Sequence, residues 1–276
     1  MEITLLGTGS PIPDPNRAGA ATLVRSGDTL LLVDAGRGVI QRLVAAGVFP
    51  GMLGAVLITH LHSDHITDLN DVITTRWIMS PQPNPLTIYG PVGMAKVVDG
   101  IMMMLGSDIN YRLDHHGDLN EGPAVVVVEV SPSDVFTVGE VSVRVGATDH
   151  RPCGPTVGFR IEGADATVVM GGDGIPCDTL DELCAGADGY VQTVLRDDLV
   201  KLIPMPRLQD ILDYHSTVEQ AAQTAARAGV GTLVLTHYVP GIGPGQEDDW
   251  RALAAAHFSG EIILGDDLTS VNITNS

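Results

Sequence analysis

Short apolar runs, rich in valine, leucine and isoleucine and bounded by glycine or proline, recur along the whole chain. In the first half they occupy residues 3–6, 21–24, 29–33, 54–58 and 86–89. In the second half they occupy residues 124–130, 141–145, 157–161, 167–170 and 232–236. Runs of this length and composition, flanked by turn residues, predict buried β-strands. Residues 124–130 and 141–145 are expected to pair with each other through a turn at Gly139.

Apolar positions spaced three or four residues apart predict helices between these strands. Residues 38–46 place Ile40, Leu43 and Val44 on one face, with Gly47 as a stop signal. Further helices are expected at residues 66–79 and 93–105, and the methionines at positions 102, 103 and 104 are expected to fill gaps in the core. Strand-rich stretches separated by a few helices predict an α/β fold of two stacked sheets with helices outside, a four-layer αββα sandwich. Because no stretch has the composition of a linker, residues 1–276 are expected to form a single domain.

Composition adds two constraints. Hydrophobic residues make up 44% of the chain and aromatic residues only 4%, so the core must be mainly aliphatic. The chain has 34 acidic and 15 basic residues, a formal net charge of −19, and its Lys and Arg residues do not cluster in the sequence. A polyanion therefore meets a repulsive long-range field, which disfavours nucleic acid as a partner.

The cysteines and the N-terminus bear on location. Cys153, Cys177 and Cys184 are odd in number and lack zinc-finger spacing, which suits a reducing compartment. The chain begins with a predicted strand and has neither a basic leader nor a long apolar stretch. We therefore expect a cytoplasmic protein with no membrane association.

The richest chemistry lies in residues 59–65, where the sequence THLHSDH follows a predicted buried strand. Alternate residues of an extended segment point the same way, so His60 and His62 can face one metal ion. If a helix begins at Ser63, Asp64 and His65 turn toward a second ion. Imidazole and carboxylate ligands suit zinc.

Three later residues also follow predicted strands. His150 comes after residues 141–145, and His237 directly follows residues 232–236. Asp173 follows residues 167–170 through two glycines, and a carboxylate there can bridge two ions. In layered folds, ligands often bind where the ends of several strands meet. These side chains are therefore candidates for the same metal site.

The pattern His-x-His-x-Asp-His resembles the signature of the metallo-β-lactamase superfamily, and other stretches resemble its ribonuclease Z branch. These stretches are residues 5–10 (LLGTGS), 32–38 (LVDAGRG), 58–66, 86–91 (LTIYGP), 215–217 (HST), 220–222 and 235–237 (LTH). The resemblance implies two Zn²⁺ ions per chain, with manganese or iron as alternatives, and a homodimer.

The resemblance also implies a ligand division and residue roles. One ion would be held by His60, His62 and His150, the other by Asp64, His65 and His237, with Asp173 between them. Asp64 would also orient a metal-bridging hydroxide as nucleophile, and His215 would assist the leaving oxygen. His215 precedes the sequence Ser216-Thr-Val-Glu219, a capping-box pattern that predicts the start of a helix.

Two departures from the ribonuclease Z pattern affect the expected substrate. The common bacterial form carries a Gly/Pro-rich arm that grips RNA between the equivalents of His150 and Asp173, whereas residues 151–172 here suggest two strands and a turn. Gly174 stands where the family usually has threonine, which is expected to enlarge the pocket. Residues 196–214 lack a regular pattern at their start and precede His215, so they are expected to form a wall or lid of that pocket.

These observations favour a dinuclear zinc hydrolase that cleaves an ester-type bond, a phosphodiester, carboxylic, lactone or sulfate ester, in a small organic substrate. The alternative is a ribonuclease Z-type endonuclease that processes tRNA 3′ ends. A redox or binding module on the same fold is a third interpretation. It is disfavoured because the chain has no room for a flavin domain and its set of metal-binding histidines is intact.

Overall fold

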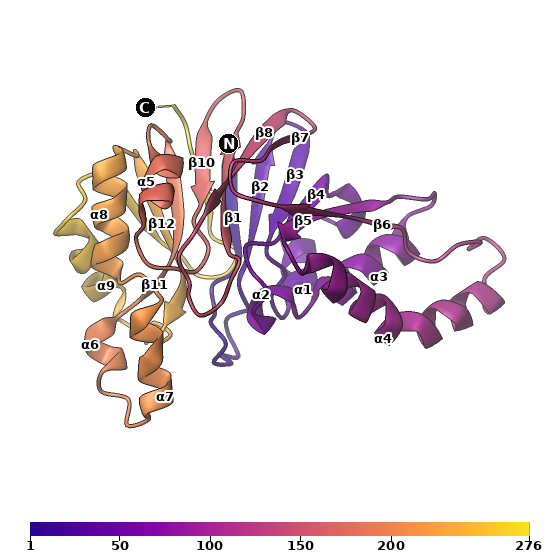
Figure 1. Ribbon diagram of the computed structural model, residues 1–276, viewed down its shortest axis with the longest axis horizontal. Coiled ribbons are helices and arrows are strands. Elements are labelled where there is room, and N and C mark those ends of the chain that lie inside the picture. Colours follow the sequence, from indigo (N-terminus) through magenta and orange to yellow (C-terminus); the bar gives the residue numbers. More distant parts are fainter. Residues whose placement is uncertain (276) are drawn as a thin grey trace.

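The computed structural model describes residues 1–275 and contains two seven-stranded sheets packed face to face (Figure 1). The first sheet has the order β14-β1-β2-β3-β4-β5-β6. Its strands are β1 (Glu2–Gly7), β2 (Ala21–Ser26), β3 (Thr29–Val33), β4 (Ala55–Leu57), β5 (Leu86–Pro91), β6 (Val125–Val130) and β14 (Ser270–Asn272). Strands β3 to β6 run parallel to their neighbours, whereas β14, β1, β2 and β3 pair antiparallel.

The second sheet has the order β13-β12-β11-β10-β9-β8-β7. Its strands are β7 (Val135–Val138), β8 (Val141–Ala147), β9 (Val157–Glu162), β10 (Thr167–Met170), β11 (Gly189–Leu195), β12 (Thr232–Val239) and β13 (Glu261–Leu264). Strands β10 to β13 are parallel to one another, and β7 to β10 form an antiparallel meander.

Helices cover the outer faces of both sheets (Figure 1). Beside the first sheet lie α1 (Val39–Ala45), α2 (Ser63–Ile66), α3 (Leu69–Met79) and α4 (Met94–His115), and beside the second lie α5 (Asp178–Cys184), α8 (Val218–Ala228) and α9 (Glu247–Ala255). Two short helices, α6 (Asp197–Val200) and α7 (Pro206–Gln209), project beyond the end of the second sheet. Short 3₁₀ segments occupy Pro50–Met52 and Asp210–Asp213. The predicted αββα arrangement is confirmed.

The space between the sheets is filled almost entirely by aliphatic side chains, as the composition predicts. Phe159 is the one aromatic residue among the buried members of this described cluster, which otherwise contains residues such as Leu31, Val143 and Val191. Separate apolar clusters lie between each sheet and its own helices. Burial on both faces explains why the central strands are continuous apolar runs.

One prediction about the connection between the sheets is wrong. Strand β6 does not pair with β8: β6 pairs with β5 in the first sheet, and β8 pairs with β7 around Gly139 in the second. The run VFTV of β7 is short and partly exposed, so its strand signal is weak. Residues 131–134 therefore form the crossing from one sheet to the other.

Helix boundaries also differ from those predicted. The segment expected at residues 66–79 divides into α2 and α3, which allows the chain to turn directly after the motif at residues 59–65. Helix α4 continues to His115, and Met103 and Met104 are 83% and 62% exposed rather than part of the core. A helix that projects past the sheet has no core against which its last turns can pack.

The capping box lies one residue later than predicted. Thr217 caps α8: its hydroxyl accepts from the Gln220 amide, and the Gln220 side chain accepts from the Thr217 amide. Strand β11 was not predicted, because its sequence GYVQTVL contains two buried polar residues, Gln192 and Thr193. Among residues 1–275, no helix has the length and apolarity needed to cross a membrane.

Candidate metal centre

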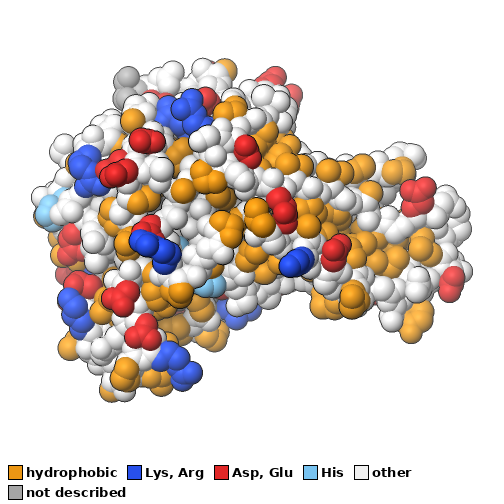
Figure 2. All heavy atoms as spheres, viewed as in Figure 1, with side chains coloured by type: hydrophobic (Ala, Val, Ile, Leu, Met, Phe, Trp, Pro, Cys, Tyr) orange, Lys and Arg blue, Asp and Glu red, His pale blue; other side chains and the backbone are white. Residues whose placement is uncertain are grey.

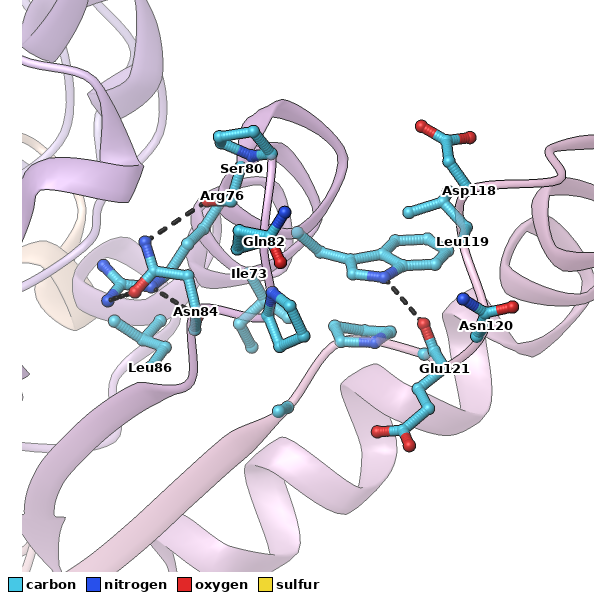
Figure 3. A pocket seen from close by; sticks show the side chains of 16 residues that line it. Ile73, Arg76, Ser80, Gln82, Asn84, Leu86, Asp118, Leu119, Asn120 and Glu121 are labelled. Atoms are coloured by element: carbon cyan, nitrogen blue, oxygen red, sulfur yellow. Dashed lines mark hydrogen bonds between the residues drawn. The ribbon is translucent and has the colours of Figure 1, made fainter.

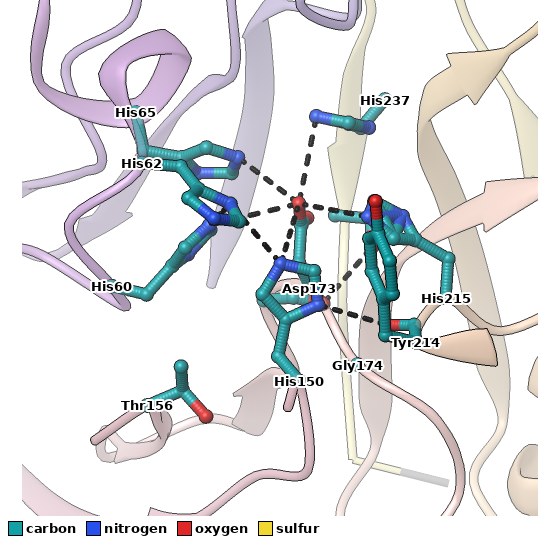
Figure 4. A network of polar contacts seen from close by, with 12 residues as sticks. His60, His62, His65, His150, Thr156, Asp173, Gly174, Tyr214, His215 and His237 are labelled. Carbon is teal, nitrogen blue, oxygen red and sulfur yellow. Dashed lines mark hydrogen bonds and ion pairs between the residues drawn. The ribbon is translucent and has the colours of Figure 1, made fainter. Parts of the chain in front are cut away.

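The candidate ligands come from four separate strand ends and meet at one edge of the sandwich (Figure 4). His60 follows β4, His150 follows β8, and Asp173 follows β10. His237 lies within β12 near its end and has a positive φ of 51°, which turns its side chain out of the normal strand alternation. Helix α2 begins at Ser63 and carries Asp64 and His65 toward the same point.

The first cluster contains His60, His62, His150 and Asp173, and its ligand atoms all lie within 4.8 Å of one another. His62 Nδ1 is 3.1 Å from His60 Nε2 and 3.2 Å from His150 Nε2. Two nitrogens bound to one tetrahedral zinc ion are about 3.3 Å apart. The three imidazoles therefore have the spacing of ligands that share an ion.

The second cluster contains Asp64, His65 and His237. Asp64 Oδ2 lies 3.1 Å from His237 Nε2 and 3.6 Å from His65 Nε2. Asp173 Oδ2 lies 3.3 Å from His65 Nε2 and 3.7 Å from both His237 Nε2 and His60 Nε2. One oxygen of Asp173 thus stands between the two clusters.

The residues fit a pair of divalent cations in two further respects. His65 Nε2 and Asp173 Oδ1 are buried and have no hydrogen-bond partner among the described residues, although buried polar atoms in folded proteins nearly always have one. Imidazole nitrogens and carboxylate oxygens are also the donor set that zinc prefers. The two His/Asp clusters together have the arrangement of a dinuclear metal site.

The electrostatics of the centre favour cation binding. Burial alone would raise the pKa of Asp173, but the charges of His237 and His65 hold it well below its usual range. Burial and the neighbouring His65 lower the pKa of His60, so its imidazole is neutral and able to coordinate. Burial lowers the pKa of His65, yet Asp173 and Asp34 together raise it above its usual value. Carboxylates that favour a proton on His65 equally favour a metal ion there.

Asp34 is a site residue that the sequence analysis did not identify. Its carboxylate accepts from His65 Nδ1 at 2.8 Å, and it also accepts from the Thr59 amide at 2.8 Å and the Thr59 hydroxyl at 2.9 Å. The Thr59 hydroxyl in turn accepts from His60 Nδ1 at 3.0 Å. Asp34 therefore orients one histidine of each cluster so that Nε2 faces the ion. An acidic residue at the end of a buried strand, in the sequence LLLVDAG, was the available signal.

His215 lies beside the metal ligands without belonging to either cluster. Its Nε2 is 3.6 Å from Asp173 Oδ2, and its ring centroid is 4.8 Å from that of His150. Burial lowers the pKa of His215 to about 4, so the imidazole is neutral at pH 7. The next residue fixes its position, because the Ser216 amide and hydroxyl both donate to the Gly174 carbonyl, at 2.9 Å and 2.7 Å.

Gly174 does not leave the open space that the amino-acid sequence suggested. A Cβ at this position would lie 2.9 Å from the Asp149 carbonyl oxygen, and φ is +153°. The backbone of Asp149 therefore occupies the place of the missing side chain. The expectation of an enlarged pocket at Gly174 is wrong.

Residues 196–213 form a small lobe next to the centre, built from α6, α7 and the following 3₁₀ turn (Figure 1). Tyr214 connects this lobe to the metal site, because its main-chain oxygen accepts from His150 Nδ1 at 2.8 Å. This hydrogen bond leaves His150 Nε2 free to face the ion. A separate cavity of about 530 Å³ is lined by residues of α3, including Trp77, and by residues 118–124, and includes none of the candidate ligands (Figure 3).

The fold and the paired clusters define a metal-dependent hydrolase with the metallo-β-lactamase fold. A family model described as the beta-lactamase superfamily domain matches residues 29–238, so the chain belongs to that superfamily. Within it the chain belongs to the ribonuclease Z family, as two curated relatives of that name show. Ribonuclease Z of Mycolicibacterium paratuberculosis is 58% identical over 99% of this chain and 98% of its own length. Ribonuclease Z of Mycobacterium tuberculosis (strain H37Rv) is 55% identical over the same shares.

Solved structures share the fold. The metallo-beta-lactamase fold protein YhfI from Bacillus subtilis has a TM-score of 0.76 and 24% identity, covering 98% of each chain. The short form of human tRNase Z has a TM-score of 0.74 and 24% identity, covering 99% of each chain. At these identities the likeness concerns the fold alone.

The relatives overturn the expected small-molecule ester substrate and the view that nucleic acid is disfavoured. Proteins that match this chain over almost their whole length are named ribonuclease Z. A net charge of −19 sums the whole surface and does not describe the field at the metal centre. The arm expected to be missing between His150 and Asp173 and the glycine at position 174 were therefore poor guides to the substrate.

Proposed function

We propose that this protein is an endoribonuclease that processes the 3′ ends of tRNA precursors by hydrolysing a phosphodiester bond. The observation that carries the proposal is the pair of adjoining His/Asp clusters in a chain 58% identical to a ribonuclease Z. We further propose that residues 1–276 act as one domain and that the protein works in the cytoplasm, where a tRNA-processing enzyme finds its substrate.

In this proposal the two ions are zinc, with manganese or iron as substitutes. His60, His62 and His150 would hold one ion and Asp64, His65 and His237 the other, and Asp173, which lies between the two clusters, would contribute as well. When bound, such ions supply Lewis acidity, which lowers the pKa of water and offsets negative charge on a phosphate group.

The remaining roles belong to side chains of this protein. Asp64 has one oxygen near His237, and its carboxylate can orient an attacking water molecule and accept its proton. His215 is neutral at pH 7, so it acts as a hydrogen-bond donor to oxygen atoms on which charge develops rather than as a charged acid. Residues 196–214 form the wall of the site that contacts the substrate.

A cleavage assay tests the proposal. Purified protein loaded with zinc or manganese is incubated with a tRNA precursor that carries a 3′ extension, and the products are mapped. We expect one cut near the mature 3′ end, and we expect His62→Ala to abolish it together with part of the bound metal. Absence of cleavage at high enzyme concentration, with hydrolysis of a carboxylic ester by the same sample, would reject the proposal.

A further inference from the structure

An RNA substrate requires cationic contacts, yet most basic side chains of this acidic protein are already paired. Ion pairs within the molecule engage Arg17, Arg42, Arg112, Arg151, Arg160, Arg196, Lys201 and Arg227 with nearby carboxylates. Among residues 1–275, four exposed cations have no ion pair and no side-chain hydrogen bond: Arg37, Lys96, Arg144 and Arg207. Two of these, Arg37 and Arg207, belong to segments that border the metal centre.

Arg37 is held beside the ligand-bearing segment that contains Asp64 and His65. The Ala35 amide donates to the His65 carbonyl at 2.7 Å, and the Asp68 amide donates to the Ala35 carbonyl at 3.0 Å. The backbone of Gly36 packs so closely on the Asp64 carbonyl that a side chain there would collide with it. The exposed guanidinium of Arg37 therefore starts from a rigid point next to the second cluster.

Arg207 belongs to the lobe that leads along the chain into the metal centre. It lies on α7, and the 3₁₀ turn that follows leads to Tyr214 and His215, whose amide donates to the Ile211 carbonyl at 3.2 Å. The Gln209 side chain donates to the Ile203 carbonyl at 2.8 Å and so ties the two halves of the lobe together. In the space-filling view, Lys and Arg side chains are scattered among Asp and Glu side chains on this face of the molecule (Figure 2).

The charge balance of the lobe makes Arg207 important. Arg196 is paired with Asp198 and Lys201 with Asp197, which leaves Asp210 and Asp213 exposed and without ion pairs in the described chain. Without Arg207 the lobe would present only unpaired negative charge to an approaching phosphate. Arg207 is therefore the one cation of the described lobe that remains available to a phosphate, beside two unpaired carboxylates.

We propose that Arg37 and Arg207 form a two-sided clamp that contacts RNA phosphates on opposite sides of the scissile bond. Guanidinium groups suit phosphate oxygens because they donate in a planar fork. Such contacts position the strand and carry no base specificity. This inference rests on the proposed function for its biological substrate, and it assigns the grip on RNA to side chains next to the metal centre.

The experiment compares Arg37→Gln, Arg207→Gln and the double variant with the wild-type protein and with Arg144→Gln. Arg144 is also an exposed, unpaired arginine, but it lies in mid-strand on β8. It is on the outer face of the second sheet, because its neighbours Val143 and Val145 point into the core between the sheets. Metal content is measured for every variant. The substrates are a tRNA precursor and bis(p-nitrophenyl) phosphate, a small diester that has one phosphate and no flanking nucleotides.

Each single variant is expected to raise KM for the tRNA precursor about fivefold to tenfold and to reduce the slope of log KM against log salt by roughly 0.7–0.9. The decrease in kcat/KM for the tRNA precursor should exceed the decrease for the small diester by the same factor of about five to ten. Arg144→Gln should match the wild-type protein on both substrates. An unchanged salt slope in the double variant, or an equal effect of Arg144→Gln, would overturn the clamp.

Binding measurements separate this inference from the proposed function. If the wild-type protein hydrolyses the small diester but leaves the precursor intact, the proposed function fails. Fluorescence anisotropy with labelled precursor then still tests the clamp. Binding that weakens in the double variant supports the clamp, whereas no binding by the wild-type protein, or binding independent of both arginines, refutes it.

Discussion

Asp34 Oδ2 accepts a hydrogen bond from His65 Nδ1 at 2.8 Å, and both side chains are buried. The same carboxylate accepts from the Thr59 hydroxyl, which accepts from His60 Nδ1. A residue that binds no ion thus sets the ring orientation of one ligand in each cluster. In this position Asp34 has a positive φ of 61°, which few residues other than glycine, asparagine and aspartate adopt readily.

Asp34→Asn should weaken metal binding by about 10- to 100-fold, because the charge that orients and polarises His65 is lost. Asparagine tolerates the same backbone conformation and keeps an acceptor for the Thr59 amide, so the fold should survive. Competition with a chromophoric chelator measures the affinity. Asp28→Asn, in the exposed turn before β3, serves as the control and should bind metal normally. Equal affinities in the two variants would show that Asp34 has no orienting role.

Removal of metal should lower the thermal stability of the protein. The centre places buried acceptors and donors, such as Asp173 Oδ1 and His65 Nε2, where they have no partner in the described chain. A ligand that binds only the folded state stabilises it by about 2.7 kcal/mol at 100 times its dissociation constant. Differential scanning calorimetry before and after chelation, followed by zinc addition, measures this effect. In Asp173→Asn most of the zinc-dependent rise in Tm should disappear, and a full rise would contradict the central place of Asp173.

His215→Ala should reduce kcat by about 10²- to 10³-fold while the metal content stays the same, because a donor to developing charge is removed. His215→Gln should recover part of the loss, since an amide can also donate. With a pKa of about 4, the group is neutral above that value and gains a proton only as the pH falls through it. The pH dependence of kcat between pH 6 and 8 should therefore be the same in the wild-type protein and His215→Gln. If kcat of the wild-type protein changed with pH in this range and kcat of His215→Gln did not, His215 would titrate there.

Gly174→Ala should destabilise the protein by about 1–3 kcal/mol, because φ is +153° and the new Cβ would meet the Asp149 carbonyl at 2.9 Å. The displaced Gly174 carbonyl would also weaken its bonds from Ser216, so kcat should fall through misplacement of His215. Gly100→Ala, in α4 where a Cβ meets nothing within 4 Å, is the matched control and should leave stability equal or slightly higher. Urea unfolding and steady-state kinetics of the two variants provide the test.

The sequence predicted the sandwich and the convergence of strand ends because both depend on local patterns. A buried strand that is almost entirely apolar, such as TLLLV in β3, can be recognised in the sequence without knowledge of its partner strands. The pairing of strands could not be predicted in the same way. The long apolar runs of β6 and β8 follow one another in the sequence, yet they belong to different sheets, because the short β7 lies between them. Asp34 was missed for a similar reason, since its role depends on His65, 31 positions away. The substrate was misjudged because a total charge was read as a local one.

Glu129 links the edge strand β6 to the start of α4 and provides a pH-dependent test of that contact. Its Oε1 accepts from the Ala95 amide at 3.1 Å and the Gly93 amide at 2.8 Å, and these hydrogen bonds lower its pKa from the usual 4.5. A carboxyl whose pKa is depressed by folding contributes stability above its unfolded pKa and loses it as the pH falls through the folded value. Glu129→Gln should therefore lower Tm slightly at pH 7, and the difference from the wild-type protein should shrink below pH 4.5. The comparison is made on metal-free protein by thermal unfolding, with Glu121→Gln as the control because the Glu121 carboxylate makes no hydrogen bond with residues 1–275. A constant difference at every pH would mean that the charge of Glu129 contributes nothing to the contact.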